Sequence, residues 1–164
     1  MISQKSKYAL RSLLALARAK SGEAVRISGI AAGEKIPKKF LEQILLDLKH
    51  HGIVTSRRGR SGGYLLLRPA HRISFGDVLR VLEGPVAPLP CLSRTAYRKC
   101  DDCGNENLCE IRKVFAQVAS RSRDILDNTT LADCLADPQF VRADPRLDWI
   151  AVSSEGSPAE NATL

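Results

Sequence analysis

The chain has 164 residues, of which 44% are apolar and 26% are charged. This length allows one ordinary domain with extensions and excludes a barrel enzyme or a pair of large domains. The apolar share is sufficient for a hydrophobic core, so the composition also excludes general disorder.

Charge is distributed unevenly along the chain. Residues 1–72 hold 15 basic and 4 acidic side chains, whereas residues 73–164 hold 10 and 14, within a formal net charge of +7. So basic a first half predicts an anionic partner, either nucleic acid or an anionic membrane surface. Arg11, Arg18 and Lys20 interrupt the longest apolar run well short of the roughly 20 residues of a membrane helix, so we expect no membrane span.

The first part of the chain predicts three helices. Apolar residues at helical spacing predict an amphipathic helix over residues 3–19. Ser28 is expected to cap a brief helix over residues 28–34. After a tight turn, Pro37 opens a third helix over residues 38–51, because a proline at a helix start loses no hydrogen bond. Two helices joined by a short turn are typical of a helix-turn-helix.

A β-hairpin is predicted next. Residues 53–56 and 64–67 are strand-like and flank a glycine-rich tip, and the short segment 24–27 is also strand-like. The predicted fold class is therefore mainly α with a small β-hairpin: a winged helix-turn-helix followed by a long helix. In this arrangement one helix enters the DNA major groove, and the wing places cations on phosphates or in a minor groove. The wing tip carries three arginines, Arg57, Arg58 and Arg60.

The third predicted helix carries polar side chains suited to reading DNA. Gln43 can form paired hydrogen bonds to adenine, while Lys38 and Lys39 suit guanine or phosphate. The carboxylate of Glu42 can accept a cytosine amino proton or repel a phosphate, and so discriminate between DNA sequences. Alternatively, it forms an ion pair along the helix with Lys38 or Lys39. The apolar residues of this helix are expected in the core: Phe40, Leu41, Ile44, Leu45 and Leu48.

The second half predicts a helix, a loop and a long helix. Ser74 and Asp77 resemble a capping box that opens a helix ending at Gly84-Pro85. A proline-rich loop extends to about residue 107, and a helix is predicted over residues 108–128. No later element is large enough to cover its apolar stripe, which favours a homodimer interface. The stripe consists of Leu108, Ile111, Phe115, Val118 and Ile125.

Four of the five cysteines lie within 19 residues with the spacing C-x8-C-x2-C-x5-C, namely Cys91, Cys100, Cys103 and Cys109. An odd cysteine count argues against a disulfide framework and predicts a reducing, cytoplasmic location. Thiolates gathered on a loop suit an iron–sulfur cluster or zinc, and free thiols are a third hypothesis. The spacing lacks the paired knuckles of a structural zinc site, which favours the cluster. Cys134 is expected to be a small buried apolar residue.

Four short motifs stand along the chain: Tyr8-Ala9-Leu10-Arg11, Phe40-Leu41-Glu42-Gln43, Arg58-Gly59-Arg60-Ser61-Gly62-Gly63-Tyr64 and Val81-Leu82-Glu83-Gly84-Pro85. Together with the cysteine loop they resemble the Rrf-two family of bacterial winged-helix regulators, which includes IscR, NsrR and RirA. The resemblance covers about residues 1–136. It implies a homodimeric transcriptional regulator that binds a palindromic site in double-stranded DNA and carries an iron–sulfur cluster that alters promoter choice.

The resemblance also implies site residues. It implies Cys91, Cys103 and Cys109 as cluster ligands and favours a 2Fe-2S cluster over a 4Fe-4S cluster, which the spacing alone does not decide. This chain departs from the family pattern, because Cys100 is inserted and Arg112 stands where some members carry a histidine ligand. The fourth ligand is then Cys100, a neighbouring aspartate (Asp101 or Asp102) or a group from the other subunit. The implied DNA contacts are Lys38, Lys39, Glu42, Gln43, Arg57, Arg58, Arg60, Ser61 and Tyr64.

The expected organisation has four parts. They are a winged helix-turn-helix DNA-binding domain (1–84), a cysteine-rich cluster loop (85–107), a dimerisation helix with a short helix capped by Thr130 (108–136), and a disordered tail (137–164). An enzyme is not expected, because no histidine lies near the cysteines and no glycine-rich phosphate loop follows a strand. The alternative to a cluster is a winged-helix regulator with structural zinc or a thiol redox switch. Some family members lack a cluster and sense metabolites through protein partners.

Overall fold

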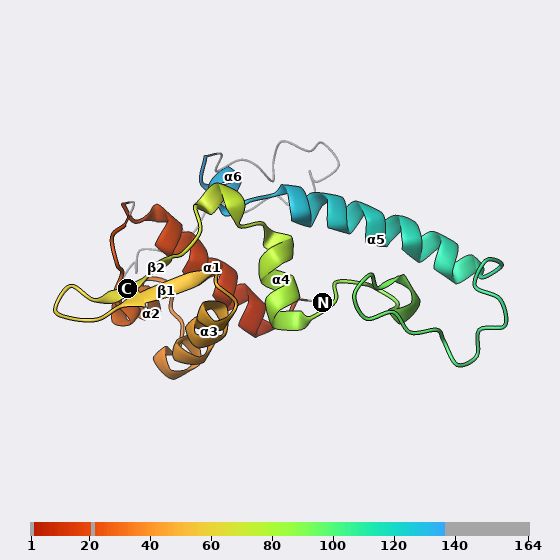
Figure 1. Ribbon diagram of the computed structural model, residues 1–164, viewed down its shortest axis with the longest axis horizontal. Coiled ribbons are helices and arrows are strands. Elements are labelled where there is room, and N and C mark those ends of the chain that lie inside the picture. The colour runs from red at the N-terminus through yellow and green to blue at the C-terminus, as the bar shows by residue number, and fades with distance from the viewer. Residues whose placement is uncertain (1, 21, 137–164) are drawn as a thin grey trace, which may run out of the picture.

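A computed structural model describes residues 2–20 and 22–136 of the chain. The helices and strands follow one another as Figure 1 shows. Their bounds are α1 Gln4–Arg18, α2 Ile27–Gly33, α3 Lys38–His50, β1 Val54–Arg57, β2 Gly63–Leu66, α4 Phe75–Glu83, α5 Glu110–Asn128 and α6 Leu131–Ala136, with short 3-10 turns at Ala70–Arg72 and Pro90–Leu92. The predicted disordered tail lies outside the described residues.

The core lies where α1 crosses the other helices of the first half. Ser3 caps α1 by accepting a hydrogen bond from the backbone N–H of Ser6, and helical spacing then places Leu13 and Leu16 in the interior. The predicted third helix is confirmed as α3, whose inward face buries four of the five expected residues: Leu41, Ile44, Leu45 and Leu48.

Two local predictions in this region are wrong. Phe40 is not a core residue: it is 39% exposed, and its ring packs edge-on against Tyr8 with centroids 5.8 Å apart. Phe40 lies in the first turn of α3, where its side chain packs against Tyr8 on the surface of α1. Ser28 does not cap the second helix, which begins one residue earlier after Arg26. The reason is non-local, because Val25 is paired with Tyr64 and the chain must therefore turn at Arg26.

The wing is an antiparallel hairpin with one additional pairing segment. β1 pairs with β2 in the register Val54↔Leu66 to Arg57↔Gly63, one residue displaced from the predicted strands. Val25 and Tyr64 exchange backbone hydrogen bonds of 2.8 and 2.9 Å, so the segment before α2 lies along β2 as a third strand-like piece. The extended character predicted for residues 24–27 is thereby confirmed at Val25, whereas Ile27 is already the first residue of α2.

The second half is built around α4 and α5. The capping box predicted at Ser74 is present, with Ser74 and Asp77 each accepting the other's backbone N–H. The long helix was predicted to begin at Leu108, but it begins at Glu110. Leu108 therefore lies just before the helix. Thr130 caps α6 by accepting the backbone N–H of Asp133, as expected.

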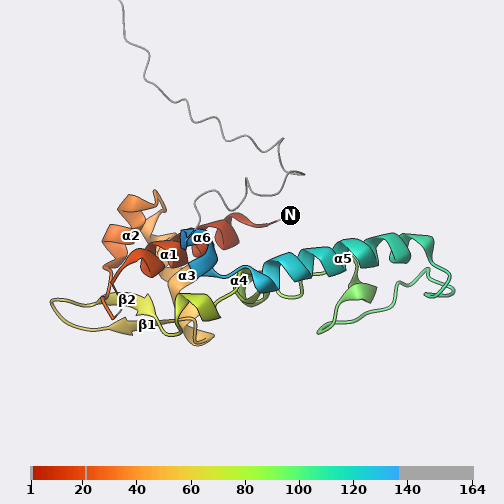
Figure 2. The same ribbon diagram turned by 90° about the horizontal axis from the view of Figure 1, so that it is seen from above.

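The molecule is elongated. The helix-turn-helix and wing form one end, and α5 projects away from them toward the other end (Figures 1 and 2). The loop between α4 and α5 lies alongside the N-terminal half of α5, remote from the wing. No helix within residues 2–20 and 22–136 has both the length and the apolarity needed to cross a membrane.

Candidate DNA-binding surface and cysteine loop

The N-terminal half of α3 presents the four polar side chains predicted to read DNA. Lys38, Lys39, Glu42 and Gln43 are all exposed. Glu42 makes no ion pair with any residue that the structure describes, so the predicted alternative of pairing along the helix is not formed. Its carboxylate is therefore available to discriminate between bases.

An ion pair fixes the C-terminal half of α3 to α1. Asp47 forms an ion pair of 2.8 Å with Lys5 of α1. The hydrogen bond from Lys5 lowers the pKa of Asp47, and the amide of Gln43 contributes in the same direction. The contact orients α3 against α1 and leaves the opposite side of α3 open.

The predicted wing cations are exposed at the tip of the hairpin. Arg57, Arg58 and Arg60 and the neighbouring Ser61 all face solvent, and none of the three arginines pairs with a carboxylate in the described ranges. Free guanidinium groups on a projecting loop are suited to phosphate contacts. Tyr64 differs from them: it is half-buried and packs against the core, while its backbone pairs with Val25.

Two glycines allow the wing to close. A Cβ atom on Gly63 would overlap the backbone carbonyl of Val25, and one on Gly62 would lie 2.5 Å from the carbonyl oxygen of Arg57. A side chain at Gly63 would force the wing and the segment before α2 apart, and one at Gly62 would distort the tip of the wing itself. Gly62 and Gly63 therefore serve close backbone approach, whereas Gly59 supplies a positive φ of 107° in the turn.

Sequence analysis missed Arg26. Its guanidinium Nη2 donates a hydrogen bond of 2.8 Å to the carbonyl oxygen of Arg60, linking the start of α2 to the wing tip. A hollow of about 460 Å³ lies between these two elements, and Ser28 is exposed on its lining. The extended pattern at residues 24–27 was the available signal, because it places Arg26 beside a strand.

The four clustered cysteines lie in two neighbouring pairs. Cys91 is 5% exposed within the 3-10 turn, and it lies close enough to Cys100 to contribute, after burial, to the raised pKa of Cys100. Cys109 has the same effect on the pKa of Cys103. Cys109 is also the N-cap of α5, where its sulfur accepts the backbone N–H of Arg112 at 3.4 Å. The loop thus delivers its last thiol to the first turn of the long helix.

These residues fit a soft metal centre by type but not in their present arrangement. Four thiols are the donors that iron–sulfur clusters and zinc prefer. Within the described part of the chain, however, no three histidine, cysteine or acidic side chains lie close enough together to hold a metal ion. Burial, and then the neighbouring thiols, raise the pKa of Cys100 and Cys103. Metal binding would require these thiols to lose their protons and the two pairs to close on one another.

Arg112 lies in the first turn of α5, next to the cysteine loop. It forms an ion pair of 3.7 Å with Glu106, which also accepts the hydroxyl of Tyr97. This contact raises the pKa of Tyr97. A guanidinium has no lone pair to offer a metal, so Arg112 is not itself a ligand and instead shapes the loop through Glu106.

Cys134 is separate from the cluster. It lies on α6 and is half-buried rather than fully buried, which corrects the prediction, and desolvation raises its pKa.

One face of α5 is strongly apolar and uncovered. Ile111 and Ile125 are 63% and 64% exposed, and Ala119 is the single buried residue among the 19 of this helix. Val114, expected from the sequence together with Leu126 to widen the stripe, is 61% exposed on the same helix. A contiguous apolar face of this kind is typical of a protein–protein interface. The members are Ile111, Val114, Phe115, Val118 and Ile125, with Leu108 just before the helix.

Comparison with known proteins identifies the family. The sequence profile of the Rrf2 family, described as "Iron-dependent Transcriptional regulator", matches residues 2–137. The chain is 52% identical over 139 residues to the rrf2-like HTH-type transcriptional regulator of Rhodobacter capsulatus, covering 83% of this chain and 93% of that protein.

Solved structures give the same result. The chain resembles CymR, the global cysteine regulator of B. subtilis, with a TM-score of 0.70, 29% identity and coverage of 83% of this chain and 96% of CymR. It also resembles T. potens IscR, with a TM-score of 0.67, 31% identity and coverage of 84% and 88%. These proteins are transcriptional regulators rather than enzymes. The chain, with its winged helix-turn-helix, therefore belongs to the Rrf2 family of DNA-binding transcriptional regulators.

Proposed function

We propose that the chain is a homodimeric regulator whose promoter binding changes with the state of an iron–sulfur cluster in the cysteine loop. The observation that carries the proposal is the position of Cys109, which belongs to the cysteine cluster and is also the N-cap of the exposed helix α5. Ordering the loop would thereby act directly on the start of α5. The description of the family as iron-dependent supports the same metal.

The proposed ligands are Cys91, Cys103 and Cys109, with Cys100 as the fourth. Cys100 already lies against Cys91, and its half-buried thiol is a softer donor than the exposed carboxylates of Asp101 and Asp102. A cluster bound here, of the 2Fe-2S type, would supply a centre that responds to iron supply, oxidants or nitric oxide. The protein's own contribution is to gather four thiols and to shield Cys91.

The proposed dimer uses the apolar face of α5. Leaving large aliphatic side chains in water is unfavourable by about 25 cal/mol per Å² of apolar surface, and a second copy would cover them. A two-fold axis presents two copies of α3 and the wing, which suits a palindromic site whose half-sites lie about one helical turn apart. Such a dimer would act on DNA in the cytoplasm.

The test is protein purified without oxygen, with its visible absorption, iron, sulfide and zinc measured together. We expect a coloured protein with iron and sulfide. Serine substitution of Cys91, Cys103 or Cys109 should abolish the colour, and so should substitution of Cys100 if it is the fourth ligand. Cys134→Ser is the matched control and should retain iron. An iron-loaded triple variant of Cys91, Cys103 and Cys109 would end the cluster proposal.

The sensory role needs its own measurement. The affinity for one palindromic site is compared between loaded and empty protein, because a signal is transmitted only by a difference in affinity. Equal affinity at every site would leave a cluster without the proposed regulatory role.

A second candidate is a thiol redox switch, which the pairwise arrangement favours. Oxidation by a peroxide would remove two electrons and two protons from each pair, forming Cys91–Cys100 and Cys103–Cys109 disulfides. Mass mapping of metal-free protein after peroxide treatment tests it. Scrambled linkages, or thiols that remain reduced while DNA binding changes, would contradict this candidate.

A further inference from the structure

A second site lies between the loop that follows α4 and the C-terminal part of α5. It is a cavity of about 250 Å³. Three arginines from three different segments line it: Arg80 of α4, Arg94 of the loop and Arg123 of α5. We call it the arginine pocket, and its polar lining is Arg80, Ser93, Arg94, Thr95, Arg123 and Asp127.

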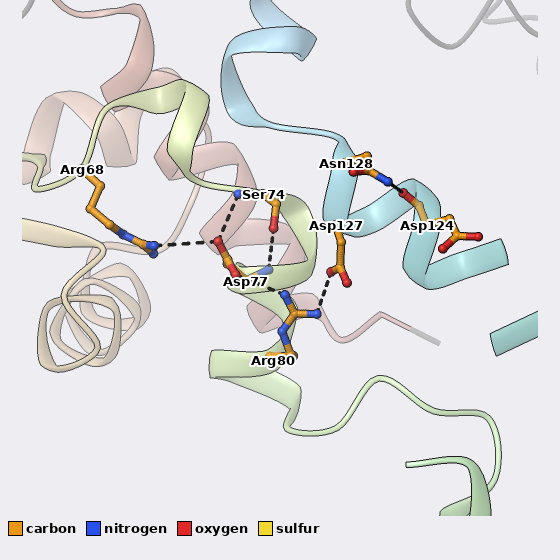
Figure 3. A network of polar contacts seen from close by, with 7 residues as sticks. All are labelled: Arg68, Ser74, Asp77, Arg80, Asp124, Asp127 and Asn128. Atoms are coloured by element: carbon orange, nitrogen blue, oxygen red, sulfur yellow. Dashed lines mark hydrogen bonds and ion pairs between the residues drawn. The ribbon is translucent and has the colours of Figure 1, made fainter. Parts of the chain in front are cut away.

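The arginine pocket carries excess positive charge. Arg80 is satisfied, because its guanidinium lies between Asp127 at 2.6 Å and Asp77 at 3.1 Å (Figure 3). Arg94 and Arg123 form no ion pair with any residue in the described ranges. The long 3.5 Å contact of Arg123 with the carbonyl of Leu92 leaves most of its donors unused. The lining therefore holds three guanidinium groups and one carboxylate, that of Asp127, while Asp77 outside the lining pairs only with the already satisfied Arg80 on this side.

The remaining polar groups can also donate. Ser93 is 8% exposed, and its hydroxyl oxygen accepts the backbone N–H of Ala96 at 2.9 Å, so its proton is free to point at a ligand. Thr95 lines the same cavity and adds a second hydroxyl. Unpaired guanidinium forks beside hydroxyl donors are the chemistry that binds carboxylates and phosphates.

We propose that the arginine pocket binds a small anion that carries a carboxylate or a phosphate-like oxyanion. Sites for drug-sized ligands occupy roughly 300–1,000 Å³, so this cavity suits a smaller, metabolite-sized molecule. Arg94 and Arg123 hold the anion, and Ser93 donates from the buried wall. The pocket is lined by residues of α4, of α5 and of the loop between them. These elements lie away from the tip of the wing (Figure 1), so phosphates of DNA held by the wing tip do not reach the pocket.

An anion in the arginine pocket would affect the ion pairs that connect α5 to α4. Arg80 links Asp127 at the end of α5 to Asp77 in α4, and Asp77 also lies 3.8 Å from Arg68, just beyond the wing (Figure 3). A bound anion competes with Asp127 for Arg80 and weakens the ion pair between α5 and α4. This consequence for DNA rests on the proposed function, whereas anion binding does not.

The experiment titrates the full chain with sodium phosphate and, separately, sodium succinate, with ionic strength held constant by chloride. Binding is followed by calorimetry and by the thermal midpoint. The pocket variant is Arg94→Gln with Arg123→Gln. The control, Arg98→Gln with Arg121→Gln, removes the same charge from exposed residues outside the pocket.

We expect saturable binding to the wild type and the control, and a loss of roughly tenfold or more in the pocket variant. Binding of phosphate alone identifies a tetrahedral oxyanion, and binding of succinate alone identifies a carboxylate. Saturable binding of neither probe, or equal binding by the pocket variant, overturns the proposal. DNA affinity is then measured with and without saturating anion. An unchanged value overturns the coupling through Arg80, while a chain that binds anion but no DNA contradicts the proposed function instead.

Discussion

Arg26 donates a hydrogen bond of 2.8 Å to the backbone carbonyl of Arg60, a residue 34 positions further along the chain. The adjacent Val25 exchanges backbone hydrogen bonds with Tyr64 in the same wing. The wing is therefore oriented against the helix-turn-helix before any DNA arrives. Because ordering a loop during binding costs free energy, this prior attachment favours affinity.

Replacing Arg58 and Arg60 with alanine should weaken binding to every duplex, since both guanidinium groups are exposed and without a carboxylate partner in the described ranges. The log–log dependence of affinity on salt should flatten by about 0.9 for each phosphate that the variant no longer neutralises. Fluorescence anisotropy across a salt series measures both effects, with Arg121→Ala on α5 as the control. If one arginine enters a minor groove, the weakening will follow A·T content. Unchanged binding by the double variant would contradict the wing assignment.

Gly63→Ala should disrupt the wing while leaving the helical core folded. The added methyl group would overlap the carbonyl of Val25, so the Val25–Tyr64 pairing must break. We expect a substantial loss of DNA affinity with little change in helical circular dichroism. Gly104→Ala is the control, because nothing lies within 4 Å of a Cβ atom there. Wild-type affinity in Gly63→Ala would show that the close approach is not needed for binding.

Ile111→Glu should yield monomers. Ile111 is exposed in the protomer, so the substitution leaves the fold intact but places an unpaired charge in the proposed seam, at a cost of several kcal/mol. Ser120→Glu introduces the same group on the opposite, exposed side of α5 and should remain dimeric. Sedimentation at micromolar concentration distinguishes them. A monomeric wild type would mean that another partner covers this face.

Stability should fall in acid partly through Glu83. The neighbouring Ser3 side chain, the Ser6 hydroxyl and the backbone N–H of Ser3 lower the pKa of Glu83, and the last two donate hydrogen bonds to its carboxylate. A lowered folded-state pKa contributes stability that is present above the unfolded value of about 4.3 and is lost as pH falls through the folded value. Ser6→Ala should therefore cost about 1 kcal/mol at pH 7 and less near pH 3.

The control for this prediction is Ser12→Ala. Ser12 is equally buried but donates to the carbonyl of Tyr8, which does not titrate in this range. Its loss should be the same at both pH values when the free energy of unfolding is measured by urea denaturation. Parallel pH profiles for the two variants would remove Glu83 from the explanation.

Features determined by a few neighbouring residues could be predicted from the sequence. The capping box at Ser74 and the cap at Thr130 are both present, because a hydroxyl and a carboxylate three residues apart satisfy each other's backbone groups locally. The exposed stripe of α5 was predictable for a related reason, since helical spacing alone sorts its residues onto one face.

Features that depend on distant segments were missed. Tyr8 draws Phe40 onto the surface of α1, and Tyr64 fixes where α2 begins by pairing with Val25. The cysteine spacing indicated four donors but not their grouping into two pairs, which depends on how the loop folds back toward Cys109. None of these pairings leaves a periodic trace in the sequence.

Cys109 caps α5 through its sulfur, and serine is among the preferred helix N-caps. Exchanging sulfur for oxygen at this position should therefore keep the first turn of the helix wound while removing a soft ligand. At Cys109 alone among the four clustered cysteines, a serine variant separates the chemistry of the loop from the mechanical integrity of the helix that follows it.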